Sequence, residues 1–173
     1  MSNVAKFRKN RLTHGIYELE GRVYASYNLK ALPLNKLLEI LVSLKDKAYH
    51  FDAGFLNQLT YTKIHYPLQA KTYMLLRELF KKRHMYSFLK LFYDAGILHH
   101  LFHTFKKVLH LPQFDGYHHY PVDIHSIKCV DALENIKEPF IKKLYDEFSE
   151  DEKLLLKIVT LFHDTGKGRV QDH

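Results

Sequence analysis

The chain has 173 residues, 46% of them hydrophobic, which is enough for one domain or one and a half with a sizeable core. Its only cysteine, Cys129, excludes an internal disulfide, and the chain has neither a secretory signal nor an apolar run of transmembrane length, so we expect a cytoplasmic protein. The net charge of +7 comes from 20 lysines and only 6 arginines spread along the chain, which makes a nucleic-acid partner unlikely because base and phosphate recognition favours arginine.

The N-terminal half is predicted to be helical after a small β-element. Residues 1–15 look like a basic, polar lead-in, and the partial alternation of apolar residues around Gly21 predicts a β-hairpin over Ile16–Asn28. Pro33 opens a helix with an apolar face. Gly96 is placed to end the last of three further helices, which we expect over residues 52–61, 67–82 and 84–94.

The C-terminal half is also predicted to be helical, over residues 97–109, 122–135, 138–148 and 150–164. Two prolines and a glycine predict an ordered loop over Leu111–Pro121. The last helix has Ser149 as its N-cap and Gly166 as its expected stop, and it is apolar almost all round, which predicts that it lies in a core. The fold class is therefore mostly α, with a division between residues 1–95 and residues 96–173.

The stretch LFHDTGKGRVQDH carries a neighbouring imidazole and carboxylate, His163 and Asp164, at the end of this last helix. Adjacent helical positions differ by about 100°, so both side chains reach one point only just beyond the helix end. Nitrogen and oxygen ligands suit Mn²⁺, Fe²⁺ or Mg²⁺, and the absence of thiols nearby in sequence argues against a cysteine-type zinc site. The alternative is an aspartate that caps the turn beside a surface histidine.

A second stretch, QFDGYHHYPVDIH at Gln113–His125, precedes this pair. In order, the two stretches resemble the HD phosphohydrolase superfamily and, more narrowly, the HD domain of the bacterial PII uridylyltransferase/uridylyl-removing enzymes. That family carries QFD-x-x-H-x-Y-x-VD-x-H and then LFHD-x-x-KGR-x-x-DH. The resemblance is strong over residues 96–173 and weaker over residues 16–83. The chain departs from the family at His103-Thr104 and at Thr165-Gly166.

The resemblance implies a helical HD-domain bundle that acts as a metal-dependent phosphodiesterase. Its reaction would remove UMP from a tyrosine of the PII signalling protein, in nitrogen regulation. The implied metal ligands are His125, His163, Asp164 and His173, with Mn²⁺ or Mg²⁺ as the ion and Fe²⁺ as a further option. Such an ion lowers the pKa of a bound water from 15.7 toward ~7.

Other residues of the two motifs receive supporting roles. Lys167 and Arg169 are candidates for binding the scissile phosphate, although Lys167 is equally well explained as a solvated loop residue. His118 is expected to hold the loop over the site or to support a ligand. Asp123 is expected to cap its helix rather than bind the ion, with orientation of a loop as the alternative.

The family also has a further aspartate ligand downstream, a nucleotidyltransferase domain and glutamine-sensing ACT domains, none of which this sequence contains. We therefore expect a piece of a longer protein, inactive or nearly so alone. Two alternatives stay open: an HD phosphohydrolase that acts on free nucleotides, and a non-catalytic helical module that docks PII or an anionic partner.

Overall fold

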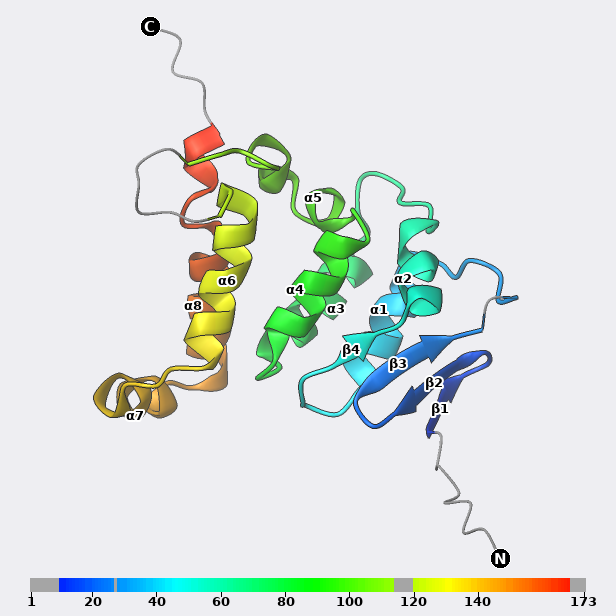
Figure 1. The fold of residues 1–173 in the computed structure, drawn as a ribbon, viewed down its shortest axis with the longest axis horizontal. Helices are drawn as coiled ribbons and strands as arrows, with labels where there is room; N and C mark the ends of the chain where they lie inside the picture. Colours follow the sequence, from blue (N-terminus) through cyan, green and yellow to red (C-terminus); the bar gives the residue numbers. More distant parts are fainter. Residues whose placement is uncertain (1–9, 27, 114–119, 169–173) are drawn as a thin grey trace, which may run out of the picture.

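A computed structural model describes residues 10–26, 28–113 and 120–168, and these residues form eight α-helices and one small sheet (Figure 1). The sheet lies at one end of the molecule, α1 to α4 form the middle, and α6 and α8 run side by side at the other end. The expected mostly helical fold with a small β-element is confirmed.

The sheet is larger than the predicted hairpin. β1 (Asn10–Thr13), β2 (Ile16–Leu19) and β3 (Arg22–Ala25) are antiparallel, and β4 (His50–Phe51) pairs with β3 in parallel. The β2–β3 hairpin turns at Glu20 and Gly21, both with positive φ, as the predicted turn requires. The basic, polar lead-in contains a strand that the sequence did not predict, because β1 is a polar edge strand held by backbone hydrogen bonds and shows no apolar alternation.

Four helices build the middle of the molecule: α1 (Leu34–Ser43), α2 (Ala53–Thr60), α3 (Ala70–Lys81) and α4 (Met85–Asp94). All four were predicted, although α3 begins at Ala70 rather than at Pro67. Gly96 ends α4 as expected, since it has a φ of +68° and its N–H bonds to the carbonyl of Tyr93.

The start of α2 lies unusually close to the sheet. Asp52 caps α2 by accepting from the N–H of Phe55, and it also accepts from the N–H of Ala25 in β3. A Cβ at Gly54 would lie 2.4 Å from the carbonyl oxygen of Ala25.

Substituting Gly54→Ala is therefore expected to lower the free energy of unfolding by about 1–3 kcal/mol, because the backbone must shift to accept the methyl group. Urea unfolding measures the change. Gly166→Ala is the matched control, since a Cβ there meets nothing within 4 Å. Equal stability of the two variants would contradict the predicted clash.

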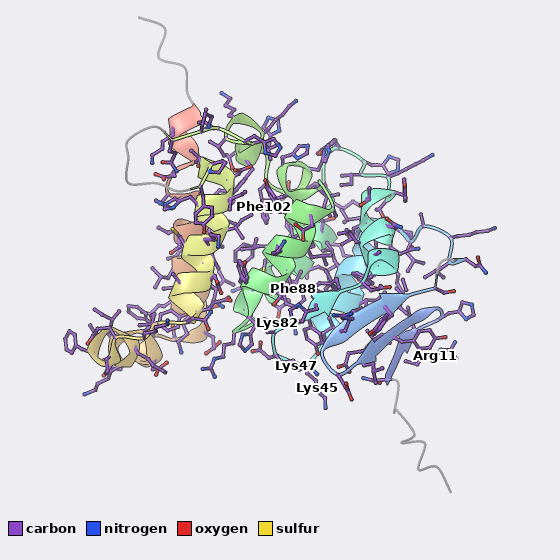
Figure 2. The ribbon with its side chains drawn as sticks, viewed as in Figure 1. Arg11, Lys45, Lys47, Lys82, Phe88 and Phe102 are labelled. Atoms are coloured by element: carbon purple, nitrogen blue, oxygen red, sulfur yellow. The ribbon has the colours of Figure 1, made fainter. Side chains whose placement is uncertain are left out.

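The predicted helix over residues 97–109 was wrong as a single element. It consists of α5 (Leu98–Leu101) and a 3₁₀ helix, η1 (His103–Lys107), separated by Phe102 in an extended conformation. The break turns the Phe102 ring edge-on to Phe80 and to Phe162, with ring centroids 5.9 and 5.5 Å apart. Phe102 is labelled in Figure 2. Aromatic packing that joins α3 to α8 therefore outweighs continuation of the helix.

Three helices follow: α6 (Val122–Glu134), α7 (Pro139–Glu147) and α8 (Glu150–Phe162). Ser149 is the N-cap of α8, as predicted, and together with Glu152 it forms a capping box. The expectation that α8 is buried all round was wrong, because it packs on α3 and α6 while Leu155 and Val159 stay 58% and 55% exposed. Gly166 is not its stop: α8 ends at Phe162, and a 3₁₀ turn, η2 (Thr165–Gly168), follows.

The division at residue 96 stays a prediction. Helices from both sides of it pack together, α3 on α8 and α4 on α6, around one cluster of buried apolar side chains. None of the helices within the described residues has the length and apolar character that crossing a bilayer requires.

Candidate metal centre

Two helices bring the predicted ligands together. His163 is the C-cap residue of α8, and Asp164 follows it directly. His125 lies in the first turns of α6, where its N–H bonds to the carbonyl of Pro121, and α6 packs along α8. The turn after Asp164 packs closely against η1. The approach is so close that a Cβ at Gly168 would lie 2.7 Å from the carbonyl oxygen of Lys107.

The carboxylate of Asp164 lies between the two imidazoles. Its Oδ2 is 3.5 Å from Nε2 of His163 and 3.7 Å from Nε2 of His125. Nδ1 of His163 is 2.7 Å from the carbonyl oxygen of Thr160. A carbonyl only accepts, so Nδ1 carries a proton, and Nε2 is the ring nitrogen that faces Asp164. This is the arrangement that orients a metal-binding histidine.

Lys167 joins this group. Its Nζ donates to Oδ2 of Asp164 at 2.8 Å and to Oε1 of Gln113 at 2.8 Å. Burial acts to raise the pKa of Asp164, but the hydrogen bond from Lys167 and the charges of His163, Lys167 and His125 outweigh it, so the pKa lies below its usual value. Asp164 is therefore ionised at neutral pH and available to a cation.

Cys129 also belongs to the cluster, although it was not among the residues predicted from the sequence. Its Sγ lies 3.4 Å from Nε2 of His125, and His125, Cys129 and His163 each place a potential ligand atom within 4.8 Å of the others. The expectation that no thiol is nearby was thus wrong. The signal was present, because Cys129 follows His125 by four residues and therefore shares its helical face. Burial, and secondarily the charge of Asp164, raises the pKa of the thiol.

Asp123 is not the N-cap residue of its helix, although its Oδ1 accepts from the first-turn N–H of Ile124 at 2.8 Å. It is the second residue of α6, whose N-cap is Pro121, and it is fully buried. Its Oδ2 accepts from the N–H of His110 at 2.8 Å, where the backbone has a positive φ of 54°. Asp123 thus orients the loop before α6, which was the alternative role. The other predicted site residues lie outside the described residues: His118, Arg169 and His173.

Comparison with known proteins gives a partial relationship. No protein-family model and no solved structure matches the chain. The bifunctional uridylyltransferase/uridylyl-removing enzyme of Bradyrhizobium diazoefficiens is 36% identical to it over 86 residues, and that of Nitrobacter hamburgensis is 33% identical over 86 residues. Part of this chain is homologous to these enzymes. The match covers 46% of the chain but only 9% of each relative.

The family-level relationship to uridylyltransferase/uridylyl-removing enzymes is therefore confirmed, while the assignment to their HD region stays a prediction. The donor set fits a divalent ion, because two imidazoles and an ionised carboxylate converge, and one imidazole is fixed by an outer hydrogen bond. The residues thus support a metal site. The type of ion is inferred from the chemistry of these ligands.

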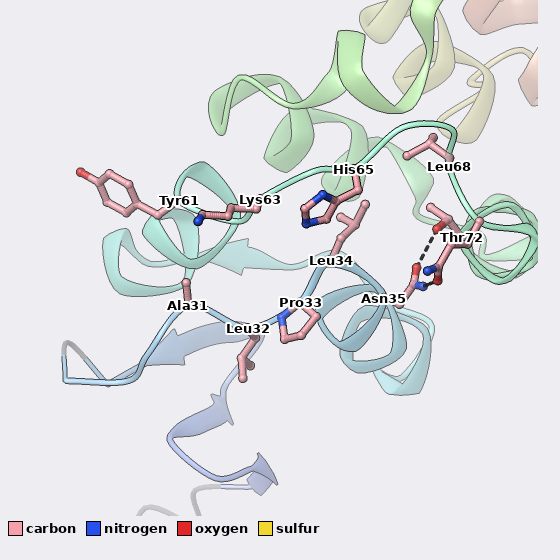
Figure 3. Close-up of a pocket in the computed structure, with 11 residues that line it drawn as sticks. Ala31, Leu32, Pro33, Leu34, Asn35, Tyr61, Lys63, His65, Leu68 and Thr72 are labelled. Atoms are coloured by element: carbon pink, nitrogen blue, oxygen red, sulfur yellow. Dashed lines mark hydrogen bonds between the residues drawn. The ribbon is translucent and has the colours of Figure 1, made fainter.

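A hollow of about 420 Å³ lies among α1, α2 and α3 in the middle of the molecule, away from the histidine cluster (Figures 1 and 3). Asn35 on its wall donates to Gln69 at 2.8 Å and accepts from Thr72 at 2.7 Å, so these polar groups satisfy one another. Its remaining walls are mainly apolar. It lacks a convergent set of acid–base or ligand groups, which makes it a poorer candidate site than the histidine cluster.

Proposed function

We propose that this chain is the HD hydrolase region, with its preceding helices, of a bifunctional PII uridylyltransferase/uridylyl-removing enzyme. The observation that carries the proposal is the meeting of His125 with His163 and Asp164. These residues come from two separate motifs, and their side chains converge with ligand chemistry. The partial homology to enzymes named for uridylyl removal supports the same reaction.

The proposed reaction is hydrolysis of the phosphodiester that joins UMP to a tyrosine of PII. His125, His163 and Asp164 would hold the divalent ion, whose chemistry is to lower the pKa of a water and to offset phosphoryl charge. When the ion binds Asp164, the Lys167 ammonium would move from Asp164 to a substrate phosphate. Its flexible stem allows this movement, and Gln113 can remain its second partner. We keep His173 as a further ligand, Arg169 as a phosphate donor and His118 as a support for the loop.

The proposal includes the setting of the chain. The matched relatives are far longer, so we propose that this sequence acts within a longer cytoplasmic protein and has little or no activity alone. Mn²⁺ or Mg²⁺ is the proposed activating ion, because a hard ion leaves room for water and substrate oxygens.

The test follows release of UMP from uridylylated PII by the full natural protein that carries this chain, with Mn²⁺ present. We expect release that stops with a chelator and with His163→Ala, which removes one imidazole from the site. A His14→Ala variant is the control, because His14 lies in the turn between β1 and β2, at the sheet end of the molecule.

The alternatives appear as distinct outcomes of this assay. Metal-dependent hydrolysis of free nucleotides without release from PII would replace the proposed substrate. Normal folding without metal binding or hydrolysis would overturn the enzyme reading in favour of a regulatory module.

A further inference from the structure

We propose that Cys129 joins His125, His163 and Asp164 in binding a metal ion at this centre. The thiol makes the site selective for a thiophilic ion, Zn²⁺, and these four side chains then fill its coordination. The inference rests on the metal-site part of the proposed function and not on the substrate. Its basis is the cluster of one thiol, two imidazoles and one carboxylate on α6 and at the end of α8.

The separations of the ligand atoms match a tetrahedral ion. Ligand atoms about 2.0–2.3 Å from a tetrahedral zinc lie about 3.3–3.8 Å from one another. Three separations here fall in that range: 3.4 Å from Sγ of Cys129 to Nε2 of His125, 3.7 Å from that nitrogen to Oδ2 of Asp164, and 3.5 Å from this oxygen to Nε2 of His163. The thiol and the two imidazoles place ligand atoms within 4.8 Å of one another, so binding of a small cation would draw them closer together.

The chemistry of the ligands favours zinc over harder ions. Imidazole and thiolate are preferred by Zn²⁺, whereas Mg²⁺ and Mn²⁺ prefer oxygen, and within the described part of the cluster Asp164 is the single carboxylate. Binding displaces the proton of the Cys129 thiol to solvent, so that one thiolate and one carboxylate balance the charge of the ion.

Closure has a consequence for the proposed hydrolase. Structural zinc sites have four protein ligands, while catalytic sites keep a position for water. A hard ion that leaves Cys129 unbound keeps that position, whereas Zn²⁺ held by Cys129 fills it. Zn²⁺ would then inhibit the Mn²⁺-dependent reaction by occupying the same site.

The experiment titrates the chain with Co²⁺, a spectroscopic substitute for Zn²⁺, and measures Zn²⁺ affinity by competition with a chromophoric chelator. We expect a thiolate-to-cobalt charge-transfer band that is absent from Cys129→Ala. We also expect this variant to bind Zn²⁺ at least about tenfold more weakly, since even residues that only support a ligand are worth ~10–100-fold. Its affinity for Mn²⁺ should be unchanged. Lys128→Ala is the control on the same helix, and circular dichroism checks the fold of each variant.

Cobalt binding without the band, equal Zn²⁺ affinity of Cys129→Ala, or no binding of either ion would overturn the inference. The proposed function fails separately. A thiolate band together with no UMP release under Mn²⁺ would remove the hydrolase proposal and leave the Cys129 site standing.

Discussion

Replacing Lys157 with alanine is expected to lower the free energy of unfolding by roughly 3–5 kcal/mol, because it leaves a buried carboxylate without its cation. Lys157 on α8 and Glu134 on α6 are each 2% exposed, and Nζ lies 3.4 Å from Oε1. Nζ also donates to the carbonyls of Phe80 and Lys82 at the end of α3. The substitution thus removes an ion pair and the partners of two backbone carbonyls together.

Glu134 connects this ion pair to a further helix, α4. Its carboxylate accepts from the N–H groups of Met85 and Tyr86 at 2.7 and 3.1 Å, in the first turn of α4. One buried pair therefore joins the end of α3 and the start of α4 to α6 and α8. Because α6 and α8 carry the histidine cluster, this pair also fixes the helices that position the candidate site.

The pH dependence of the loss provides a sharper readout. Burial raises the pKa of Glu134 from 4.5 to about 7, against the opposing effects of Lys157 and the two N–H groups. The folded state then binds more protons than the unfolded state between these values, so the contribution of Glu134 to stability falls as the pH rises from about 4.5 to 7. Without Lys157 the ionised carboxylate is disfavoured further, and the variant should lose more stability at pH 8 than at pH 5.

Urea unfolding at both pH values measures these differences. Lys90→Ala is the matched control, since Lys90 forms an exposed pair with Asp94 at 2.7 Å and should contribute under about 1 kcal/mol. Lys157→Met keeps the apolar stem and separates packing from charge. If Lys157→Ala costs no more than Lys90→Ala, the buried pair does not have the proposed importance.

The sequence predicted the elements whose signals are local. The apolar period of α1, the turn at Gly21 and the N-cap at Ser149 each depend on a few neighbouring residues, and each is found. The features that it missed depend on partners distant in sequence. The extended conformation of Phe102 depends on ring contacts with Phe80 and Phe162. The sequence of residues 97–109 alone does not predict these contacts.

The candidate site divides in the same way. Motifs predicted His125, His163 and Asp164, and the structure brings them together. Cys129 was not predicted because it is distant in sequence from His163 and Asp164, although it lies one turn along the helix from His125. The burial of Lys157 could not be predicted from the sequence, because a lysine in an apolar helix normally extends its charged end to solvent.

Asp164→Asn is expected to reduce UMP release by the full natural protein at least about 100-fold, since loss of a residue that merely supports a ligand already costs ~10–100-fold. The amide keeps the shape of the side chain but removes the negative charge that His125, His163 and Lys167 surround. Both imidazoles remain, so the ion should still bind, only more weakly. Raising the concentration of Mn²⁺ should then restore part of the activity.

Steady-state assays across a range of Mn²⁺ concentrations separate weaker metal binding from slower hydrolysis. Asp131→Asn is the matched control, because Asp131 lies on α6 and hydrogen-bonds to Asn135 away from the cluster. The proposed role of Asp164 fails if Asp164→Asn matches this control at low Mn²⁺. Removing the charge of a carboxylate that binds the ion must weaken ion binding. If activity is lost, Mn²⁺ does not restore it and the affinity for Mn²⁺ is normal, Asp164 acts instead on the substrate or on Lys167.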